Sequence, residues 1–307
     1  MKNILVLYYT QTGQLSDILN GVLQPLKTNS EIALTYYAIK PKIPYPFPWT
    51  AIQFFDAFPE TVLDIPCELD LSDFNKDAKY DLIILGYQVW YLSPSIPISS
   101  FLKTTQAEVI FKNTPVVTVI GCRNMWLMAQ EKMKSKILFL KTSIVGNIVF
   151  FDKAPNIISV VTISAWLIGG KREGFMKIFP RSGVSYKDVK ESSKFGNILL
   201  ENIKIGDYAD LQLKLNTAKA IIVKPNLMLL EKRGSKSFKV WAKFVRNKGN
   251  AGNKRRFGRV RLFATVLPVA ILLLTPVKAV SSFLILKLTQ KKIKKEIQYF
   301  SQNSLRK

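Results

Sequence analysis

Along the first two thirds of the chain, short apolar runs alternate with stretches whose apolar residues recur at helical spacing. Residues 4–9, ILVLYY, form an unbroken apolar run, which is typical of a strand buried on both faces of a sheet. Residues 15–26, LSDILNGVLQPL, place apolar side chains three and four positions apart, as in a helix with one buried face. Together the two patterns predict a strand, a turn and a helix in direct succession.

The same alternation recurs further along the chain. Strand patterns occupy residues 80–90, 114–124 and 141–153, and helix patterns occupy residues 98–105, 126–140 and 186–203. Strands that alternate with helices predict an α/β fold with a doubly wound parallel sheet, whose ligand lies beyond the carboxyl ends of the strands. The loops after Tyr9, Gly86 and Gly121 fall at that edge. A further apolar stretch at 156–170 is too short to cross a bilayer, and we expect a buried sheet or dimer element there.

The turn after the first strand is rich in hydroxyl groups. Thr10, Thr12 and Ser16 can each donate a hydrogen bond, and Gly13 allows a close approach to the backbone. Free N–H groups at the start of a helix favour a phosphate. Because this turn contains no Lys or Arg, a monophosphate held by neutral donors suits it better than a triphosphate or a dinucleotide. A hydroxyl-capped helix without a ligand remains the alternative.

Two features of the composition exclude whole classes of chemistry. Histidine is absent, which removes Ser-His-Asp and Cys-His triads and HExxH zinc sites. The two cysteines, Cys67 and Cys122, are too few for a disulfide framework and lack CxxC spacing. We therefore expect structural thiols, no metal centre and a reducing, cytoplasmic location.

The positive charge is concentrated in the last quarter of the chain, which we call the tail (residues 231–307). The whole chain has a net charge of +24, and the tail alone holds 20 Lys or Arg against 2 Asp or Glu. We place a boundary near Leu230, with a complete domain over residues 1–230, and expect that removing the tail exposes no core face. Such a basic segment can bind nucleic acid or anionic lipid.

A hydrophobic run inside the tail favours lipid over nucleic acid. Residues 262–277 are apolar but contain two prolines, and they approach the length of a bilayer crossing only when extended to residue 286. Basic residues on both sides conflict with a single crossing. We expect a re-entrant or interfacial segment at 262–286 on the cytoplasmic face of a membrane, with a single transmembrane helix as the variant and no nucleic-acid partner.

The turn after the first strand also resembles a known family. "YYTQTGQL" is similar to the T-x-T-G-x-T loop with which flavodoxins bind the phosphate of FMN, although Leu15 stands where the family has its last threonine. The resemblance implies a flavodoxin-like fold and FMN as cofactor. It places cofactor-binding residues in this first loop at Thr10, Gln11, Thr12, Gly13, Gln14, Leu15 and Ser16.

Two later loops extend this resemblance. "GYQVWYLSPSIPISSFL" is similar to the flavodoxin and quinone-reductase loop in which an aromatic residue covers the isoalloxazine ring, and "GCRNMW" matches the third flavin-contacting loop. The further cofactor-binding residues implied are Gln88, Val89, Trp90 and Tyr91 in the second loop and Cys122, Arg123 and Asn124 in the third. Aromatic residues packed as core remain the alternative for the second loop.

Residues 40–66 form an insertion that a short flavodoxin does not need. It is rich in proline at 41–48, which predicts an ordered loop rather than a helix, and its aromatic residues are Phe47, Trp49, Phe54, Phe55 and Phe58. We interpret it as a lid for a lipophilic substrate, with extra packing over the sheet as the alternative. "PYPFPWT" and "FFDAFPE" also resemble bacterial dialkylresorcinol condensing enzymes.

That second resemblance implies a reaction. In such pathways a ketosynthase, here a candidate partner, builds a cyclohexanedione that is then aromatised to a resorcinol. A flavin can accept the hydride, so we expect an FMN-dependent oxidoreductase, with Tyr87, Tyr91 and Asp56 as unranked proton acceptors. A condensing role fits a chain without histidine poorly. A flavodoxin-type electron carrier and a cofactor-free membrane scaffold are the alternatives.

Overall fold

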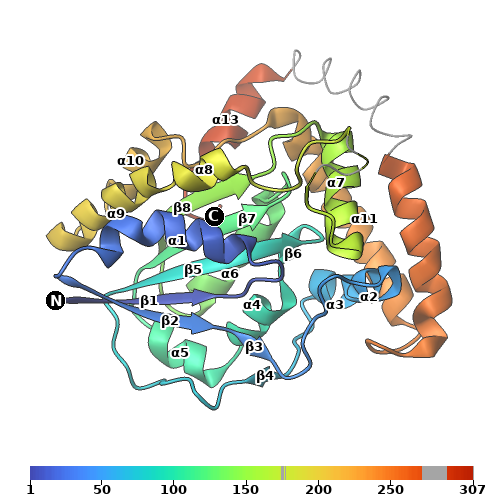
Figure 1. The fold of residues 1–307 in the computed structure, drawn as a ribbon, viewed down its shortest axis with the longest axis horizontal. Helices are drawn as coiled ribbons and strands as arrows, with labels where there is room; N and C mark the ends of the chain where they lie inside the picture. Colours follow the sequence, from blue (N-terminus) through green and yellow to red (C-terminus); the bar gives the residue numbers. More distant parts are fainter. Residues whose placement is uncertain (174–175, 177, 272–288, 307) are drawn as a thin grey trace.

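The computed structural model describes residues 1–173, 176, 178–271 and 289–306, and its centre is a parallel sheet (Figure 1). The sheet has the order β2-β1-β5-β7-β8, every neighbouring pair is parallel, and the short β6 pairs with the end of β5 in the antiparallel sense. The strands are β1 (Lys2–Tyr8), β2 (Ile32–Ala38), β5 (Leu82–Trp90), β6 (Ser93–Pro94), β7 (Val116–Cys122) and β8 (Ile144–Phe151). A separate two-stranded ribbon joins β3 (Lys40–Pro41) to β4 (Leu69–Asp70).

The strand order defines the fold class. Counted by the five parallel strands alone, the order is 2-1-3-4-5, which is that of the flavodoxin-like doubly wound sheet. From β2 the chain crosses back over β1 and adds β5 on the other side of β1. In sheets of this kind a ligand binds at the carboxyl edge between the loops that follow two such strands. The prediction of a flavodoxin-like α/β fold is therefore confirmed.

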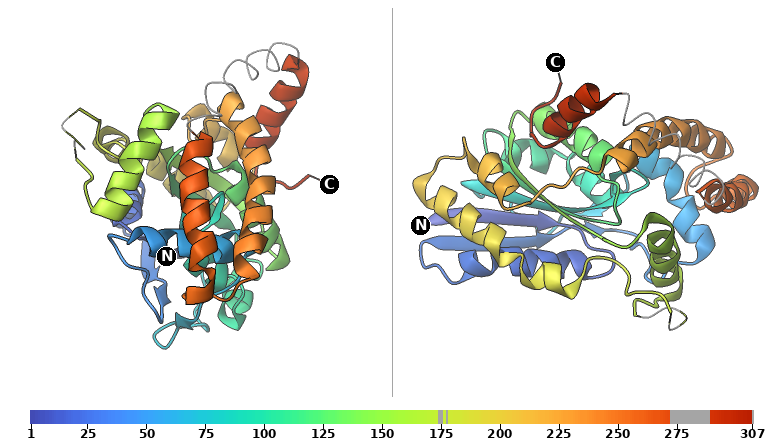
Figure 2. Two further views of the ribbon diagram at one scale, coloured as in Figure 1. Left: turned by 90° about the vertical axis from the view of Figure 1, so that its right-hand side faces the viewer. Right: turned by 90° about the horizontal axis from the view of Figure 1, so that it is seen from above.

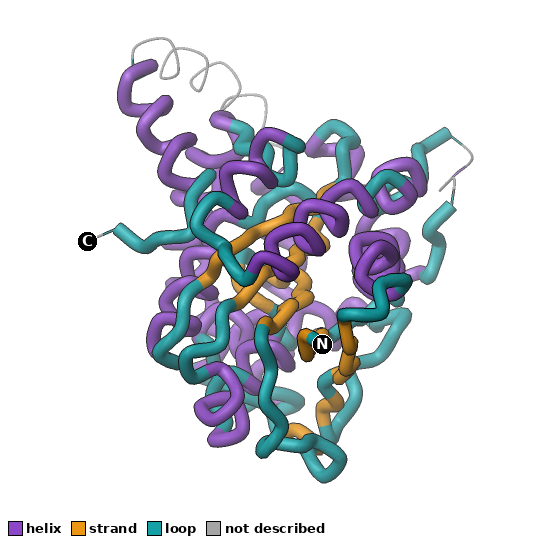
Figure 3. Tube along the Cα trace, turned by 90° about the vertical axis from the view of Figure 1, so that its left-hand side faces the viewer, coloured by secondary structure: helices purple, strands orange, loops and turns teal. Residues whose placement is uncertain are grey.

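Helices cover both faces of this sheet, as Figure 3 shows from the amino ends of the strands. Along β1, Ile4 and Val6 pack on one face while Leu5 and Leu7 pack on the other, and all four are fully buried. The first face carries α1 (Gln14–Lys27), α9 (Ser193–Ile205) and α10 (Leu211–Thr217). The second face carries α4 (Ile96–Phe101), α5 (Thr105–Phe111), α6 (Leu127–Phe139) and α13 (Gln290–Phe300).

One predicted helix is divided in two. The pattern at 186–203 becomes α8 (Tyr186–Lys190) and α9, with the break at Ser192. At this break the chain approaches α1 so closely that a Cβ on Gly21 would lie 2.6 Å from the carbonyl oxygen of Val189. The backbone thus packs closely against α1 where the helix is interrupted.

Two predictions of local structure are wrong. The apolar stretch at 156–170 is not part of the sheet but a helix, α7 (Asn156–Gly169), which begins after Pro155 and ends at Gly170 in the left-handed conformation. Its alternative role as a dimer element stays a prediction. The insertion contains the helices α2 (Ala51–Asp56) and α3 (Phe58–Leu63). Its proline-rich part ends at residue 48, and Thr50 then forms a capping box with Gln53. Pro59 lies in the first turn of α3, where a helix accepts proline.

The tail packs on the body of the protein. It begins inside α11 (Pro225–Arg246), continues through η2 (Lys254–Arg256) and enters a tail helix at residues 257–271, which lies beside α11 in Figure 2. Ile293 and Phe300 of α13 join the core on the second face of the sheet, together with Met228. The expectation that removing the tail exposes no core face is therefore wrong.

The predicted membrane segment at 262–286 lies largely outside the described residues, which stop at 271 and resume at 289. Within the described ranges, none of the helices combines the length and the apolar character that a bilayer crossing needs.

Candidate functional site

Four segments that do not belong to the sheet or to its covering helices lie at the carboxyl edge of the strands. The insertion, α7, α11 and the tail helix all lie at this end of the strands in Figure 1, beyond the loops that follow β1, β5 and β7. Ligands of doubly wound sheets bind at the carboxyl edge. In this protein, segments that are distant in sequence meet at the same edge.

The first loop presents an open helix N-terminus. Gly13 is the N-cap of α1, has a φ of 79°, and within the described part of the chain has no side-chain cap. A Cβ built on it would meet no described atom within 4 Å, so the N–H groups of the first turn are accessible to a ligand. The buried Oγ1 of Thr10 has no hydrogen-bond partner among the described residues. A buried, unpaired hydroxyl beside free N–H groups suits an oxyanion.

Three other residues predicted in this loop have structural partners instead. Gln11 donates from Nε2 to the carbonyl oxygens of Tyr45 at 3.1 Å and Pro46 at 2.6 Å, which attaches the loop to the insertion. Gln14 forms two hydrogen bonds with the backbone of Val184. Leu15 is buried in the core. The Thr10 hydroxyl and the open N-terminus of α1 thus stay available for a ligand, and these three side chains do not.

The second loop is a strained hairpin turn. Val89 pairs with Pro94 and Trp90 with Ser93, which leaves Tyr91 and Leu92 as the two central residues, at φ values of 48° and 60°. Turns of this kind favour Asn and Gly, and a left-handed conformation costs other residues about 1–2 kcal/mol each. The hydroxyl of Tyr91 donates to the carbonyl oxygen of Phe54 at 2.7 Å, a contact that stabilises the turn.

The two aromatic residues predicted to contact a flavin occupy different ring clusters. Trp90 lies edge-on to Tyr9, Tyr45 and Trp49, with centroid distances of 5.9, 5.2 and 5.6 Å. Tyr91 instead packs against the rings of α2 and α3. Gln88 accepts a hydrogen bond from the backbone N–H of Gln11 at 3.1 Å, so the second loop is also tied to the first.

The third loop is anchored to the start of α7. Arg123 donates from Nη1 to the side-chain oxygen of Asn156 at 2.8 Å, and Asn124 donates to the same oxygen at 2.9 Å. Burial lowers the pKa of Arg123 to about 10 and raises the pKa of the Cys122 thiol, so that thiol stays protonated. The buried Oδ1 of Asn124 finds no partner in the described part of the molecule.

A cavity of about 440 Å³ lies between the second and third loops. Its walls come from six separate segments and are mainly apolar; Arg123, Asn156 and Arg233 are among the few polar residues. The apolar residues are Phe54, Phe55, Val89, Leu92, Met125, Val160, Ile163, Leu230, Phe238, Leu267, Pro268, Ala270 and Ile271. A space of this size and lining suits a lipophilic small molecule.

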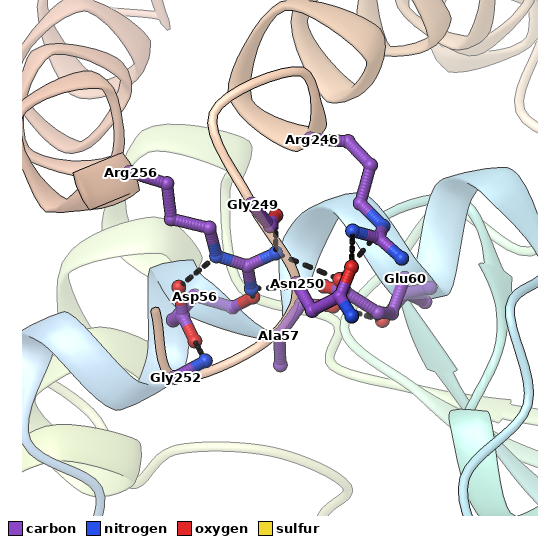
Figure 4. A network of polar contacts seen from close by, with 9 residues as sticks. Asp56, Ala57, Glu60, Arg246, Gly249, Asn250, Gly252 and Arg256 are labelled. Carbon is purple, nitrogen blue, oxygen red and sulfur yellow. Dashed lines mark hydrogen bonds and ion pairs between the residues drawn. The ribbon is translucent and has the colours of Figure 1, made fainter. Parts of the chain in front are cut away.

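A buried ion-pair network joins the insertion to the tail (Figure 4). The side chain of Arg256 is fully buried and contacts the carboxylates of Asp56 at 2.6 Å and Glu60 at 2.7 Å. Arg256 also donates to the backbone oxygens of Asp56 and Gly249, and the N–H of Gly252 donates to Asp56 at 2.8 Å. Glu60 has a second cation nearby in Arg246, at 3.4 Å. Asp56, Glu60 and Arg256 thus each lie against an opposite charge.

Aromatic packing supports the same junction. Phe58 of α3 stacks on Phe263 of the tail helix at 3.9 Å, and Phe238 and Trp241 of α11 surround this pair. The insertion therefore does form part of a cover over the carboxyl edge, but as two short helices held in place by the tail.

None of the three predicted proton acceptors is an unengaged base. Tyr87 is fully buried and donates to Gln130 at 2.6 Å. Burial raises the pKa values of Tyr87 and Tyr91 well above the usual range, and Asp56 is paired with Arg256. The structure thus favours none of them for accepting a proton from a substrate.

A buried carboxylate near the cavity has no counterpart in the sequence-based predictions. Glu231 of α11 accepts a hydrogen bond from the N–H of Met128 at 2.7 Å and so caps the start of α6. Burial raises its pKa to about 7. Neither Glu231 nor Asn156 belongs to a local motif, because each forms its hydrogen bonds with residues that are distant in sequence.

Comparison with solved structures finds flavoproteins of low similarity to this chain. A flavoprotein from Lactobacillus acidophilus, solved in complex with FMN, shares 18% identity, over 48% of this chain and 93% of its own, with a TM-score of 0.37. Candidate flavoproteins from Bacteroides eggerthii and Bacteroides uniformis share 15% and 16% identity over 48% and 54% of this chain and 88% and 97% of theirs, with TM-scores of 0.38 and 0.37. The chain matches no family model and no curated protein.

Proposed function

We propose that this protein is an FMN-dependent oxidoreductase that acts on a lipophilic ring compound. The observation that carries the proposal is the position of the apolar cavity, which lies against the second and third loops at the carboxyl edge of a flavodoxin-like sheet. The unpaired Thr10 hydroxyl and the open N-terminus of α1 suit the phosphate of FMN.

Residues of the first and third loops have distinct roles in this proposal. Thr10, Thr12 and the first-turn N–H groups of α1 hold the phosphate, while Arg123 and Asn124 offer polar groups beside the cavity. FMN supplies a hydride acceptor when it is bound. The apolar walls orient the substrate and exclude water from it.

The substrate that we favour is a dialkyl cyclohexanedione, which loses a hydride and a proton to become a dialkylresorcinol. The resemblance of the insertion to dialkylresorcinol condensing enzymes suggests this compound, and a mainly apolar wall suits its alkyl chains. A ketosynthase that makes the dione is the partner this reaction requires.

Two alternatives are less well supported by the geometry. An electron carrier needs an exposed cofactor edge and has no use for a lined cavity of about 440 Å³. A cofactor-free scaffold would leave the buried Thr10 and Asn124 oxygens, which lack partners within the described residues, without a function.

The decisive experiment measures the flavin spectrum of the purified protein after reconstitution with FMN. Anaerobic addition of a dialkyl cyclohexanedione should bleach the oxidised flavin band in a single turnover and yield one resorcinol per flavin. A protein that binds no FMN contradicts the cofactor assignment. A bound flavin that the dione does not reduce contradicts the substrate assignment and favours the carrier.

We also propose that the basic tail brings the protein to anionic membranes. On α13, Ile293 and Phe300 face the core while Lys291, Lys292 and Lys294 are exposed, so a basic face remains for headgroups. Full-length protein should sediment with phosphatidylserine vesicles and not with phosphatidylcholine vesicles. Equal sedimentation with both would contradict the electrostatic contribution, and complete release by 1 M salt would contradict apolar insertion.

A further inference from the structure

Beyond the three loops, the segment that follows α7 brings two arginines to the N-terminus of α1. Gln14, in the first turn of α1, fixes this segment: its Oε1 accepts from the N–H of Val184 and its Nε2 donates to the carbonyl oxygen of Val184, both at 3.2 Å. Gly183 has a φ of 83°, and a Cβ there would lie 2.7 Å from the Gln14 side chain. The neighbouring residues Ser182 and Arg181 are therefore held close to the first loop.

Polar groups of this segment are buried without partners. The Ser182 side chain is 1% exposed, and its Oγ has no hydrogen-bond partner among the described residues. The same is true of Nε of Arg172 and Nη2 of Arg181. Burial, and secondarily the charge of Arg181, lowers the pKa of Arg172, so the two guanidinium groups lie near enough to repel each other.

The surroundings hold both guanidinium groups in fixed positions. Arg172 lies over the ring of Trp166 at 4.6 Å, and Arg181 lies over the ring of Tyr186 at 3.3 Å. Arg181 also pairs with the exposed Glu173 at 2.5 Å. The other acids nearby are Asp17, in the first turn of α1, and Asp152, which already accepts from Gly183, Ala154 and Ser159. An anion with several oxygens would satisfy the remaining donors and relieve the repulsion.

We propose that Arg172, Arg181 and Ser182 form the second half of the phosphate site whose first half is the first loop. The first loop lacks charged donors, its Gln14 side chain is engaged with Val184, and Leu15 contributes none. The segment after α7 supplies the missing charge for a phosphate monoester dianion. This inference rests on the proposed function, because FMN is the phosphate monoester that we expect here.

The test compares FMN with riboflavin, which has the same ring but no phosphate. Dissociation constants from flavin fluorescence quenching are measured for wild type, for Arg172→Gln/Arg181→Gln, and for the control Lys171→Gln/Lys187→Gln, which removes the same charge from exposed positions. Loss of charged hydrogen bonds should weaken FMN binding by about tenfold to a hundredfold in the arginine variant. Riboflavin binding should change by less than about twofold, and the control should match wild type.

Two further measurements keep the inference falsifiable. Arg172→Lys/Arg181→Lys retains the charge and should bind FMN with intermediate affinity, even if the glutamine variant folds poorly. Equal FMN affinity in wild type and the glutamine variant overturns the inference, as does an equal loss for FMN and riboflavin. If wild type binds no flavin, the proposed function fails, and the arginine site is tested with inorganic phosphate alone. The inference is supported if phosphate raises the melting temperature of wild type, while chloride of equal ionic strength does not and the arginine variant shows no rise. No such rise overturns it.

Discussion

Replacing Arg256 with methionine tests how the tail holds the insertion. The substitution keeps an unbranched chain but removes the guanidinium that contacts Asp56 and Glu60. The side chains of these two acids are only 12% and 9% exposed, so their charges remain largely buried without Arg256. Glu60 then keeps only Arg246, at 3.4 Å, and Asp56 has no charged partner among the described residues. Breaking a buried ion pair from one side costs about 3–5 kcal/mol, which is a large part of the stability of an ordinary domain.

The assay is urea unfolding followed by tryptophan fluorescence, with Arg255→Met as the matched control. Arg255 is exposed and next in sequence, so its replacement should change the free energy of unfolding by about 0.5 kcal/mol or less. A loss below about 1 kcal/mol for Arg256→Met would refute the reasoning that the network is a principal contact of the junction.

A triple variant separates charge from packing. Asp56→Asn with Glu60→Gln and Arg256→Met removes the two carboxylates and the buried guanidinium at similar volume and leaves only the partly exposed Arg246 charged. Replacements of this kind are often neutral. We expect this variant to recover most of the stability lost in Arg256→Met. If it remains as unstable as the single variant, lost packing and not unpaired charge is the cause.

Three further predictions concern the cofactor site and its surroundings. Glu231 keeps its proton in the folded state up to about pH 7 but loses it near pH 4.5 when the chain is unfolded. The free energy of unfolding of wild type, relative to Glu231→Gln, should therefore fall by about 1.4 kcal/mol per pH unit between these two values. Urea midpoints of the two proteins that run parallel from pH 4.5 to 8 would contradict this. Thr12→Ala with Gly13→Val should abolish FMN binding, because the helix N-terminus is then blocked; unchanged flavin content after gel filtration would remove the phosphate-loop assignment. Trp90→Ala should weaken FMN binding and increase flavin fluorescence, and no change in either would show that Trp90 belongs only to its ring cluster.

Local patterns were sufficient to predict four of the five parallel strands and the turn before α1, but they did not locate β2. The apolar run at 4–9 and the turn that ends in Gly13 each lie within a few residues, and both specify their structure through burial and backbone conformation alone. The stretch at 156–170 is misjudged because its apolar residues, interrupted by Ser159, Thr162 and Ser164, show no clear period that separates a buried strand from a buried helix.

The rest of the site could not be predicted because its contacts are distant in sequence. Asp56 meets Arg256 across 200 residues, and Gln14 meets Val184 across 170. No window of sequence contains both partners. In the same way, the amphipathic pattern of α13 indicates an apolar face but does not say whether lipid or the protein's own core covers it.

The junction between insertion and tail also has a consequence for the order in which the protein becomes functional during synthesis. Chains emerge from the ribosome amino end first, and contacts between distant residues form late. Asp56 and Glu60 leave the ribosome about 200 residues before Arg256, and the cavity walls extend to residue 271. The first loop and the sheet strands are therefore complete long before the cavity can close. On the proposed function, the residues assigned to the phosphate are therefore all made before the last of those that enclose the substrate, because the lined cavity forms only once the chain has reached residue 271.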